Sequence, residues 1–258
     1  MRDAFFAALL EARGAVGTER SSKTKTGTSR RAQLTMPVPS ESAATAALEH
    51  FEAGSIKHDP YVRPTATLEQ WIWRVQGLAA LDVLERVEPY ISAEMAPKAL
   101  GILARLAEVP PVYASADLFS ASSLRDSDND DDRDAYCAGL LESRGRFGIG
   151  RAVTREGKVP EPFLNIGHRE KYLADIVRDY LGGGEITETL STKKGRTRTH
   201  WVWKLRGAEA LGALERMRGH MLDKSARYAD CLLDRDYPGI PEGSLYDTPA
   251  LDEVARAS

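Results

Sequence analysis

Two short segments of this chain read almost alike, FAALLEARG at residues 6–14 and CAGLLESRG at residues 137–145. Each is a run of small and aliphatic residues that ends in Glu, a small residue, Arg and Gly, and the copies lie 131 positions apart. The residues downstream of each copy repeat in step with it. Such an internal repeat predicts one structural unit present twice, so any function has to be sought in a pseudo-symmetric pair.

The clearest downstream repeat is a pair of tryptophan segments, WIWRVQG and WVWKLRG. The Trp-x-Trp pattern is typical of a strand, and the segments that follow it, from Leu78 and from Ala208, have helical spacing. Because the tryptophans occupy equivalent places, we expect all four to pack between sheet and helix rather than to stack on single-stranded nucleic acid. They are Trp71, Trp73, Trp201 and Trp203.

The periodicity of the first copy predicts the order helix, strand, strand, helix, strand, strand, helix, helix. The expected ranges are 3–13, 15–23, 31–38, 42–53, 56–62 and 68–76, with two further helices up to 107. The first repeat thus spans 1–107, and the second spans 134–233. Between them, 108–133 predicts an exposed acidic linker with Ser and Pro, and 234–258 predicts an irregular C-terminal tail.

Small residues recur four positions apart in each motif helix, at Ala8 and Ala12 and at Gly139 and Ser143. Residues at this spacing share one helix face, and a face without bulky side chains lets two helix backbones approach closely. We expect the two motif helices to pack on each other. The alternative is that these residues simply pack on a sheet.

Composition is that of a soluble globular protein, with 42% hydrophobic and 28% charged residues over 258 positions. Cys137 and Cys231 have no CxxC spacing, which favours reduced thiols over a zinc site. The chain has no apolar stretch of about 18 residues and no secretory signal pattern. We therefore expect no membrane partner and a cytoplasmic location, associated with the nucleoid if the source is bacterial.

The net charge of −3 argues against a nucleic-acid partner, but the charges are unevenly distributed. Acidic residues concentrate at 126–134 and in the tail, whereas basic residues concentrate at 20–31, 144–158 and 193–206. The local charge of a surface decides what it binds, so the basic clusters are stronger evidence about a nucleic-acid partner than the net charge of the whole chain.

The motif pair and its surroundings resemble the LAGLIDADG homing endonuclease family. CAGLLESRG before RFGIG matches well and FAALLEARG before AVG matches less closely, while LGGGEI, WVWKLRG and Lys224 in the last helix also fit. The resemblance covers both repeats. It implies an α+β fold of two pseudo-symmetric αββαββα repeats, whose antiparallel saddle-shaped sheets lie in the major groove of a long DNA site and which pack through the motif helices. It also implies a monomer that cuts both strands with Mg²⁺ held by one carboxylate from each motif helix.

The motif departs from the family at its eighth position, where the resemblance implies the metal-binding carboxylate. Here that position holds Arg13 in the first repeat and Arg144 in the second. A guanidinium only donates hydrogen bonds and stays charged, so it repels Mg²⁺ and suits a phosphate instead. Our hypothesis is that both arginines contact DNA phosphates at the centre of the site.

The nearest acids, Glu11 and Glu142, fall at the sixth position. Residues two apart on a helix point about 200° apart, so neither replaces the missing acid directly. The lysine that the family places near each active centre is kept as Lys224, but the aligned residue in the first repeat is Glu94. Glu94 could offer a carboxylate to a metal or be a solvated helix residue.

Basic residues along the expected strands form the candidate DNA-binding set. They are Arg20, Lys23, Lys25, Arg30 and Arg31 in the first repeat, and Arg146, Arg151, Arg155, Lys158, Lys193, Lys194, Arg196 and Arg198 in the second. The second hairpin of the first repeat is less basic, which predicts unequal half-sites and an imperfect palindrome. Gln33 and Asn165 are candidate adenine readers.

Three functions follow. The first is a binder of a long double-stranded DNA site whose cleavage is weak or lost, which needs no metal cofactor. The second is an active Mg²⁺-dependent site-specific endonuclease with non-standard carboxylates. The third is an RNA-binding, maturase-like protein, and only the family's usual preference separates DNA from RNA.

Overall fold

The computed structural model of the chain describes residues 2–24, 27–38, 40–59, 61–63, 66–68, 70–91, 129–154, 157–193, 196–234 and 243–244. For 18–24, 27–31, 61–63, 66–68, 152–154, 157–159, 191–193, 196 and 243–244 it describes the backbone only. The chain divides into two compact units, Met1–Gly139 and Leu140–Ser258. None of the described helices has the length and apolar character needed to span a membrane.

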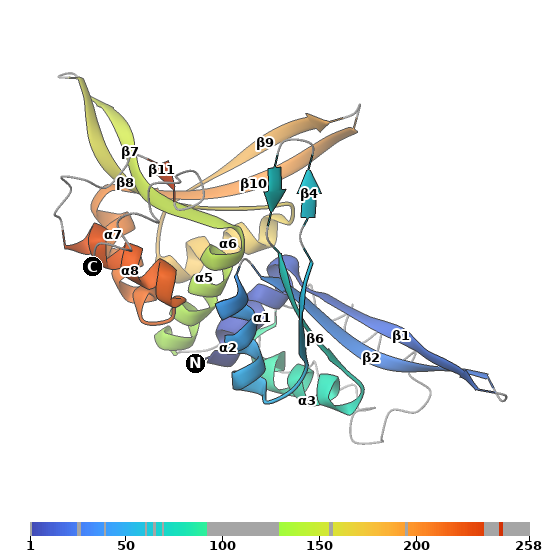
Figure 1. Cartoon of the computed structure of the whole chain (residues 1–258). Helices are drawn as coiled ribbons and strands as arrows, with labels where there is room; N and C mark the ends of the chain where they lie inside the picture. Colours follow the sequence, from blue (N-terminus) through green and yellow to red (C-terminus); the bar gives the residue numbers. More distant parts are fainter. Residues whose placement is uncertain are drawn as a thin grey trace. The chain divides into compact units, whose positions relative to one another are not determined.

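The first unit is a four-stranded antiparallel sheet with helices on one face. Its elements are α1 (Arg2–Arg13), β1 (Ala15–Thr24), β2 (Gly27–Val38), α2 (Glu41–Phe51), β3 (Ser55–His58), β4 (Tyr61–Arg63), β5 (Ala66–Leu68), β6 (Trp71–Gln76), α3 (Leu78–Val87) and the 3₁₀ turn η1 (Glu88–Tyr90). The sheet order is β1-β2-β6-β3, and β4 pairs with β5. Helices α1, α2 and α3 lie along one face of the sheet (Figure 1).

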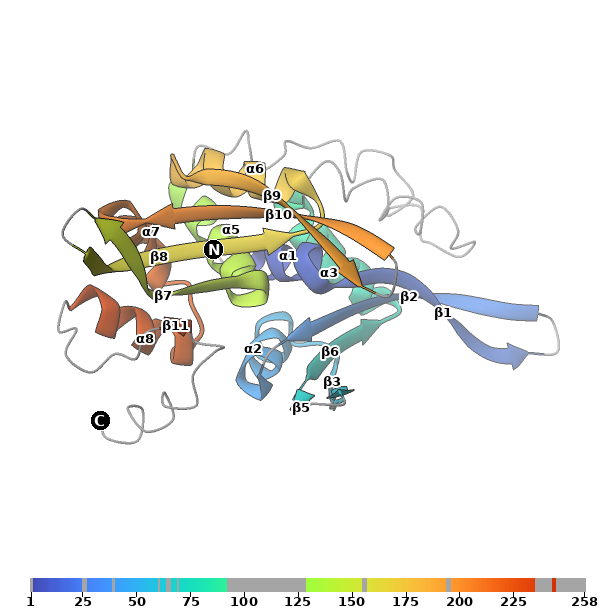
Figure 2. The ribbon, with the colours of Figure 1, turned by 90° about the horizontal axis from the view of Figure 1, so that it is seen from above.

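The second unit repeats this plan. After α5 (Asp130–Arg144) come β7 (Gly145–Thr154), β8 (Gly157–His168), α6 (Lys171–Leu181), β9 (Glu185–Lys193), β10 (Arg196–Arg206), α7 (Gly207–Arg218), α8 (Asp223–Leu233) and β11 (Gly243–Ser244). The antiparallel sheet has the order β11-β7-β8-β10-β9. In Figure 2 its four long strands run side by side over the helices of the unit. The predicted α+β fold with two repeats is confirmed.

Alternation along the strands explains why each sheet has one covered face. In β2 the side chains of Leu34 and Met36 are 0% and 1% exposed beneath the helices, whereas Gln33 and Thr35, which alternate with them, are only half-buried. Successive side chains of a strand point to opposite faces, so burying the apolar set leaves a polar set on the other face. We call this second, helix-free side the open face of each sheet.

The motif helix of the second repeat begins before the expected boundary at 134. Helix α5 starts at Asp130, and the side chain of Asn129 accepts a hydrogen bond of 3.2 Å from the amide of Asp131. Three aspartates occupy its first turn, where negative charge is favoured by the helix dipole. The last part of the predicted acidic linker is therefore the start of a helix.

Close packing of the motif helices is visible within the first unit, which includes residues 130–139 of α5. A Cβ at Gly139 would collide with the Phe5 carbonyl oxygen and lie 2.9 Å from the Cβ of Ala8. Glycine is therefore required for this approach of α5 to α1. Packing of the small face of one motif helix on the other is confirmed at this point.

Two predicted strands of the first unit are shorter than expected. The strand expected over 56–62 ends at His58, and the one expected over 68–76 begins at Trp71, with β4 and β5 forming a separate pair. Pro60 and Pro64 fall between these pieces, and proline lacks the N–H that a continuous ladder requires. The tail is not wholly irregular either, because Gly243 and Ser244 pair with Ile149 and Gly148 of β7.

Candidate nucleic-acid interface

The open face of the second sheet carries basic and amide side chains at the middle of the strands. Along β10, Trp203 and Leu205 are 0% and 3% exposed on the helix side, so the alternating Lys204 and Arg206 fall on the open face. In the register, Asn165 of β8 is opposite both Lys204 of β10 and Arg146 of β7. Three side chains that can address base edges or phosphates therefore occupy neighbouring strands.

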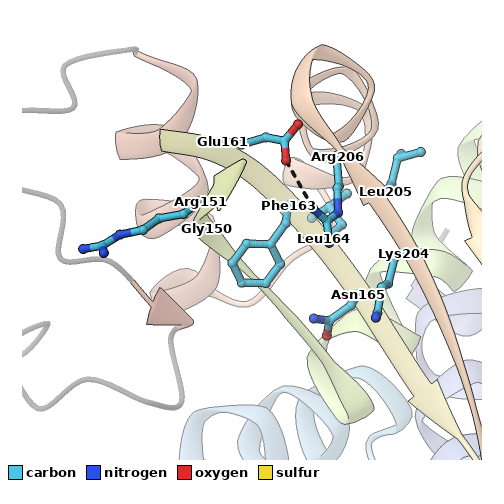
Figure 3. Close-up of a pocket in the computed structure, with 9 residues that line it drawn as sticks. All are labelled: Gly150, Arg151, Glu161, Phe163, Leu164, Asn165, Lys204, Leu205 and Arg206. Atoms are coloured by element: carbon cyan, nitrogen blue, oxygen red, sulfur yellow. Dashed lines mark hydrogen bonds and ion pairs between the residues drawn. The ribbon is translucent and has the colours of Figure 1, made fainter. Parts of the chain in front are cut away.

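A shallow hollow of about 230 Å³ lies in this open face. Its lining residues are Gly150, Arg151, Glu161, Phe163, Leu164, Asn165, Lys204, Leu205 and Arg206. Figure 3 shows the phenyl ring of Phe163 beside Asn165 and Lys204, with an ion pair of 3.5 Å between Glu161 and Arg206 above it. The ion pair holds the guanidinium at the rim of the hollow.

The open face of the first sheet is polar in a different way. Arg74 of β6 donates a hydrogen bond of 3.0 Å to the Gln33 carbonyl oxygen, and the Gln33 amide nitrogen donates one of 2.9 Å to Thr35. Gln76 lies opposite Gln33 in the register and is exposed. The candidate adenine reader Gln33 thus has both ends of its amide engaged inside the sheet, whereas Asn165 lies at the hollow.

The predicted basic residues of the first repeat lie on the hairpin of β1 and β2, where the structure describes the backbone. The register pairs Arg20 with Arg30 and Glu19 with Arg31, and a bulge separates Arg20 from Lys23. Position 31 is two residues before Gln33 and so belongs to the open face of the sheet. Position 30 is two residues before Ala32 and so belongs to the covered face. Lys25 lies outside the described residues.

In the second repeat, Arg146, Arg151 and Arg198 are exposed. Arg151 is two residues after Ile149 and so belongs to the covered side of β7. In Figure 3 its side chain points away from Asn165 and Lys204. The backbone register pairs Lys158 with Val153 and Lys193 with Arg196. Arg155 and Lys194 lie outside the described residues.

The two glutamates of the motif are buried and engaged within their units. Glu11, 7% exposed, accepts a hydrogen bond from the Tyr136 hydroxyl within the first unit. Glu142, 5% exposed, accepts one of 3.0 Å from the amide of Leu222. Burial raises the pKa of the Glu142 carboxyl to about 7, although hydrogen bonds from Ser225 and Leu222 lower it in part. Both carboxyls are therefore buried and engaged in hydrogen bonds inside their units.

The eighth motif positions lie at the ends of the motif helices. Arg13 is the last residue of α1 and Arg144 the last of α5, and both are exposed. A cation at a helix C-terminus is favoured by the helix dipole, and a guanidinium can donate two parallel hydrogen bonds to a phosphate. Lys224 is exposed in the first turn of α8, and Glu94 lies outside the described residues.

The donor set does not fit the Mg²⁺ that the motif family implies. Mg²⁺ prefers oxygen ligands in a near-octahedral shell, and the guanidiniums of Arg13 and Arg144 provide none. The carboxyls of Glu11 and Glu142 are buried and hydrogen-bonded to Tyr136 and to Leu222. Among the described residues, no group of three His, Cys, Asp or Glu side chains is placed to hold a metal ion.

The tryptophan prediction is confirmed for one residue of each pair. Trp73 and Trp203 are 1% and 0% exposed, and their indole N–H groups donate to the carbonyls of Ala53 and Gly183 at 3.0 and 2.9 Å. The other two, Trp71 and Trp201, are half-buried on the interior strands β6 and β10. Trp71 stacks near His58 with ring centroids 4.5 Å apart, and the Lys171 ammonium lies 5.6 Å from the Trp201 ring.

Sequence reasoning missed the basic residues between and after the tryptophans. Arg74, Lys204 and Arg206 lie on the open faces, yet the candidate set included only charges near the hairpins. The signal that could have found them is the phase of the Trp-x-Trp strand. If the tryptophans face the helices, the alternating residues have to face the opposite side.

No protein-family model and no curated protein sequence matches this chain. Solved structures do match it in fold. The LAGLIDADG homing endonuclease I-SmaMI bound to cleaved DNA is 14% identical with a TM-score of 0.55, covering 89% of this chain and 87% of its own. The LAGLIDADG meganuclease I-AabMI bound to uncleaved DNA is 14% identical with a TM-score of 0.51, and 91% of each chain is covered.

A third match is the LAGLIDADG homing endonuclease I-GzeII in complex with its DNA target. It is 13% identical with a TM-score of 0.51, covering 99% of this chain and 96% of its own. These likenesses confirm the fold expected from the motif resemblance. The chain has the single-chain, two-repeat fold of LAGLIDADG homing endonucleases.

Proposed function

We propose that this protein is a monomeric, site-specific binder of double-stranded DNA that holds its target without cutting it. The proposal rests first on the fold, because the three proteins named above are each described in complex with DNA. It rests also on the open faces, which carry Arg74 in the first unit and Lys204 and Arg206 in the second. A twisted sheet with such side chains suits the major groove.

The unequal open faces support an imperfectly palindromic target. In the second unit Lys204 and Asn165 adjoin a hollow, whereas in the first unit Arg74 and Gln33 are hydrogen-bonded to each other. Asn and Gln pair with adenine, but the Gln33 amide is already engaged by Arg74 and Thr35 whereas Asn165 lies at the hollow, so the two units would prefer different base pairs. Each half-site would therefore have its own sequence.

The proposed absence of cleavage rests on the residues at the ends of the motif helices. Both eighth positions hold exposed arginines, and both neighbouring glutamates are buried in hydrogen bonds. Arg13 and Arg144 would bind backbone phosphates where a nuclease of this fold holds its metal. The target would thus be bound through charge-assisted hydrogen bonds that require no divalent cation.

The decisive experiment is selection from a pool of random DNA duplexes in EDTA, followed by incubation of the enriched duplex with Mg²⁺. We expect enrichment of a site longer than one helical turn, bound in the nanomolar range typical of specific complexes, and no strand breaks. A clean double-strand break would overturn the binder assignment in favour of an active endonuclease. Preferential displacement of the duplex by structured RNA of matched sequence would favour the maturase-like function instead.

A further inference from the structure

On the open face of the second sheet, the described aromatic side chain of Phe163 has polar neighbours on its own strand. Phe163 lies on β8 between Glu161 and Asn165 in the open-face phase, while Leu164 and Ile166 alternate with it into the core. The residue 130 positions earlier, at the equivalent place in the first repeat, is Gln33. The two open faces therefore differ in polarity at one matched position.

The neighbouring strand β7 has glycines, without side chains, next to the phenyl ring. In the register, Gly148 of β7 is opposite Phe163, and Gly150 is opposite Glu161. A Cβ at Gly150 would be 3.3 Å from Cδ1 of Phe163, a tighter contact than is usual, so the ring leans over this glycine. Gly148 adds no side chain opposite the ring, and Gly150 lines the hollow beside it.

The opposite wall of the hollow is polar. Asn165 and Lys204 are paired across β8 and β10, and Figure 3 shows Asn165 next to the phenyl ring with Lys204 beyond it. The Glu161 carboxylate and the Arg206 guanidinium close one end with their ion pair of 3.5 Å. The hollow thus presents an apolar surface next to an amide that can both donate and accept.

This combination matches a particular base pair. In the major groove the only apolar group on the edges of the four standard bases is the C5-methyl of thymine, and Asn pairs bidentately with the N6 and N7 of adenine. We propose that the hollow of the second unit takes the C5-methyl group of a pyrimidine, with Phe163 contacting the methyl group and Asn165 the paired adenine. This inference rests on the proposed binding of duplex DNA and names the base pair that one unit selects.

No such contact is available at the matched position of the first unit. Gln33 is polar, and its amide is engaged with Arg74 and Thr35. The requirement for a methyl group should therefore be confined to one half of the target. Among natural bases, thymine and 5-methylcytosine both carry this group, and the partner base distinguishes them.

The test replaces each thymine of the selected duplex, one at a time, by deoxyuridine, which removes the methyl group alone. For the wild-type protein we expect a loss of about fourfold in affinity at one or two positions of a single half-site, the effect of burying one methyl-sized group. Phe163→Gln, which installs the residue of the first unit, should abolish this loss. Phe163→Leu, which keeps an apolar side chain, should retain it, and Gln33→Ala should leave it unchanged.

A second arm places cytosine or 5-methylcytosine, paired with guanine, at the sensitive position. The methylated pair should bind about fourfold more tightly than the unmethylated one to wild type and equally to Phe163→Gln. Tighter binding of thymine–adenine than of methylcytosine–guanine supports the contact of Asn165 with adenine, and the reverse order overturns that contact. Tight duplex binding without any uracil-sensitive position, or sensitivity that persists in Phe163→Gln, overturns this inference alone. Failure to enrich any duplex overturns the proposed function as well.

Discussion

The buried carboxyl of Glu142 makes the stability of the second unit depend on pH, and Glu142→Gln should remove that dependence. The side chain is 5% exposed at the end of α5 and accepts a hydrogen bond of 3.0 Å from the amide of Leu222. A glutamine has nearly the same shape, and its carbonyl oxygen can accept the same hydrogen bond. The substitution therefore removes the titration while keeping the packing.

The magnitude follows from the pKa. Burial raises the pKa of Glu142 from 4.5 to about 7, so the folded protein holds this proton at pH values where the unfolded chain has released it. The stabilisation that the protonated carboxyl contributes is complete below pH 4.5 and is lost as pH rises through about 7. At about 1.4 kcal/mol per pH unit, this interval corresponds to a loss of about 3 kcal/mol by pH 8.5.

The assay is urea unfolding at pH 4.5 and pH 8.5, followed by tryptophan fluorescence and far-UV circular dichroism. The free energy of unfolding of Glu142→Gln minus that of wild type should rise by about 3 kcal/mol between the two pH values. Glu188→Gln serves as the control, because it removes one carboxylate from an exposed position of the same unit. Parallel pH profiles for wild type and Glu142→Gln would refute the reasoning, since they would mean that burial does not hold the proton on this carboxyl.

Two further predictions concern backbone packing and DNA affinity. Gly184→Ala should destabilise the protein by about 2 kcal/mol or more in the same assay, because φ is +93° and the new Cβ would collide with the Trp203 ring. Gly212→Ala in α7 should instead be neutral or stabilising by up to about 1 kcal/mol, since nothing lies within 4 Å of its Cβ position. Arg13→Ala with Arg144→Ala should weaken binding of the selected duplex and reduce the slope of log Kd against log salt by about 1.8, at about 0.9 per phosphate contact; an unchanged affinity and slope would mean that neither arginine touches phosphate.

The repeat and the phase of its strands could be predicted from sequence because they depend on local periodicity. The spacing of Trp71 and Trp73, and of Trp201 and Trp203, is enough to identify a strand and its covered face. The burial of only one tryptophan of each pair could not be predicted in this way. Position within the sheet decides it, since Trp71 and Trp201 lie at the outer ends of the helix-covered region beside His58 and Lys171.

The candidate interface was predictable only in part. Charge clusters drew attention to Arg20, Arg30 and Arg198 in the hairpins, whereas the register shows that Lys204 and Arg206, at the end of the third basic cluster, lie on the open face. The hollow beside Phe163 depends on Gly150 in a neighbouring strand, a contact that no single segment encodes. Sequence patterns thus identify which face of a strand is open, but the tertiary register decides which side chains meet on it.

The roles of the motif glutamates depend on contacts between distant residues. Glu11 meets Tyr136, which is 125 positions away, and Glu142 meets Leu222, which is 80 positions away. The residue aligned with Tyr136 in the first repeat is Phe5, which has no hydroxyl to donate. The pseudo-symmetry of the sequence is therefore broken at the partner of this carboxyl, while its burial is kept in both repeats.

Within each motif, the sixth position affects stability and the eighth position affects the chemistry of the site. The sixth position is buried and hydrogen-bonded, so a change there disturbs the core of its unit. The eighth position, Arg13 or Arg144, is exposed at a helix end, so its charge can be exchanged with little effect on packing. Arg13→Asp with Arg144→Asp should therefore keep the wild-type fold by circular dichroism at a cost of about 1 kcal/mol per helix end, and Mg²⁺-dependent cutting gained by that variant would report on the chemistry of these two positions.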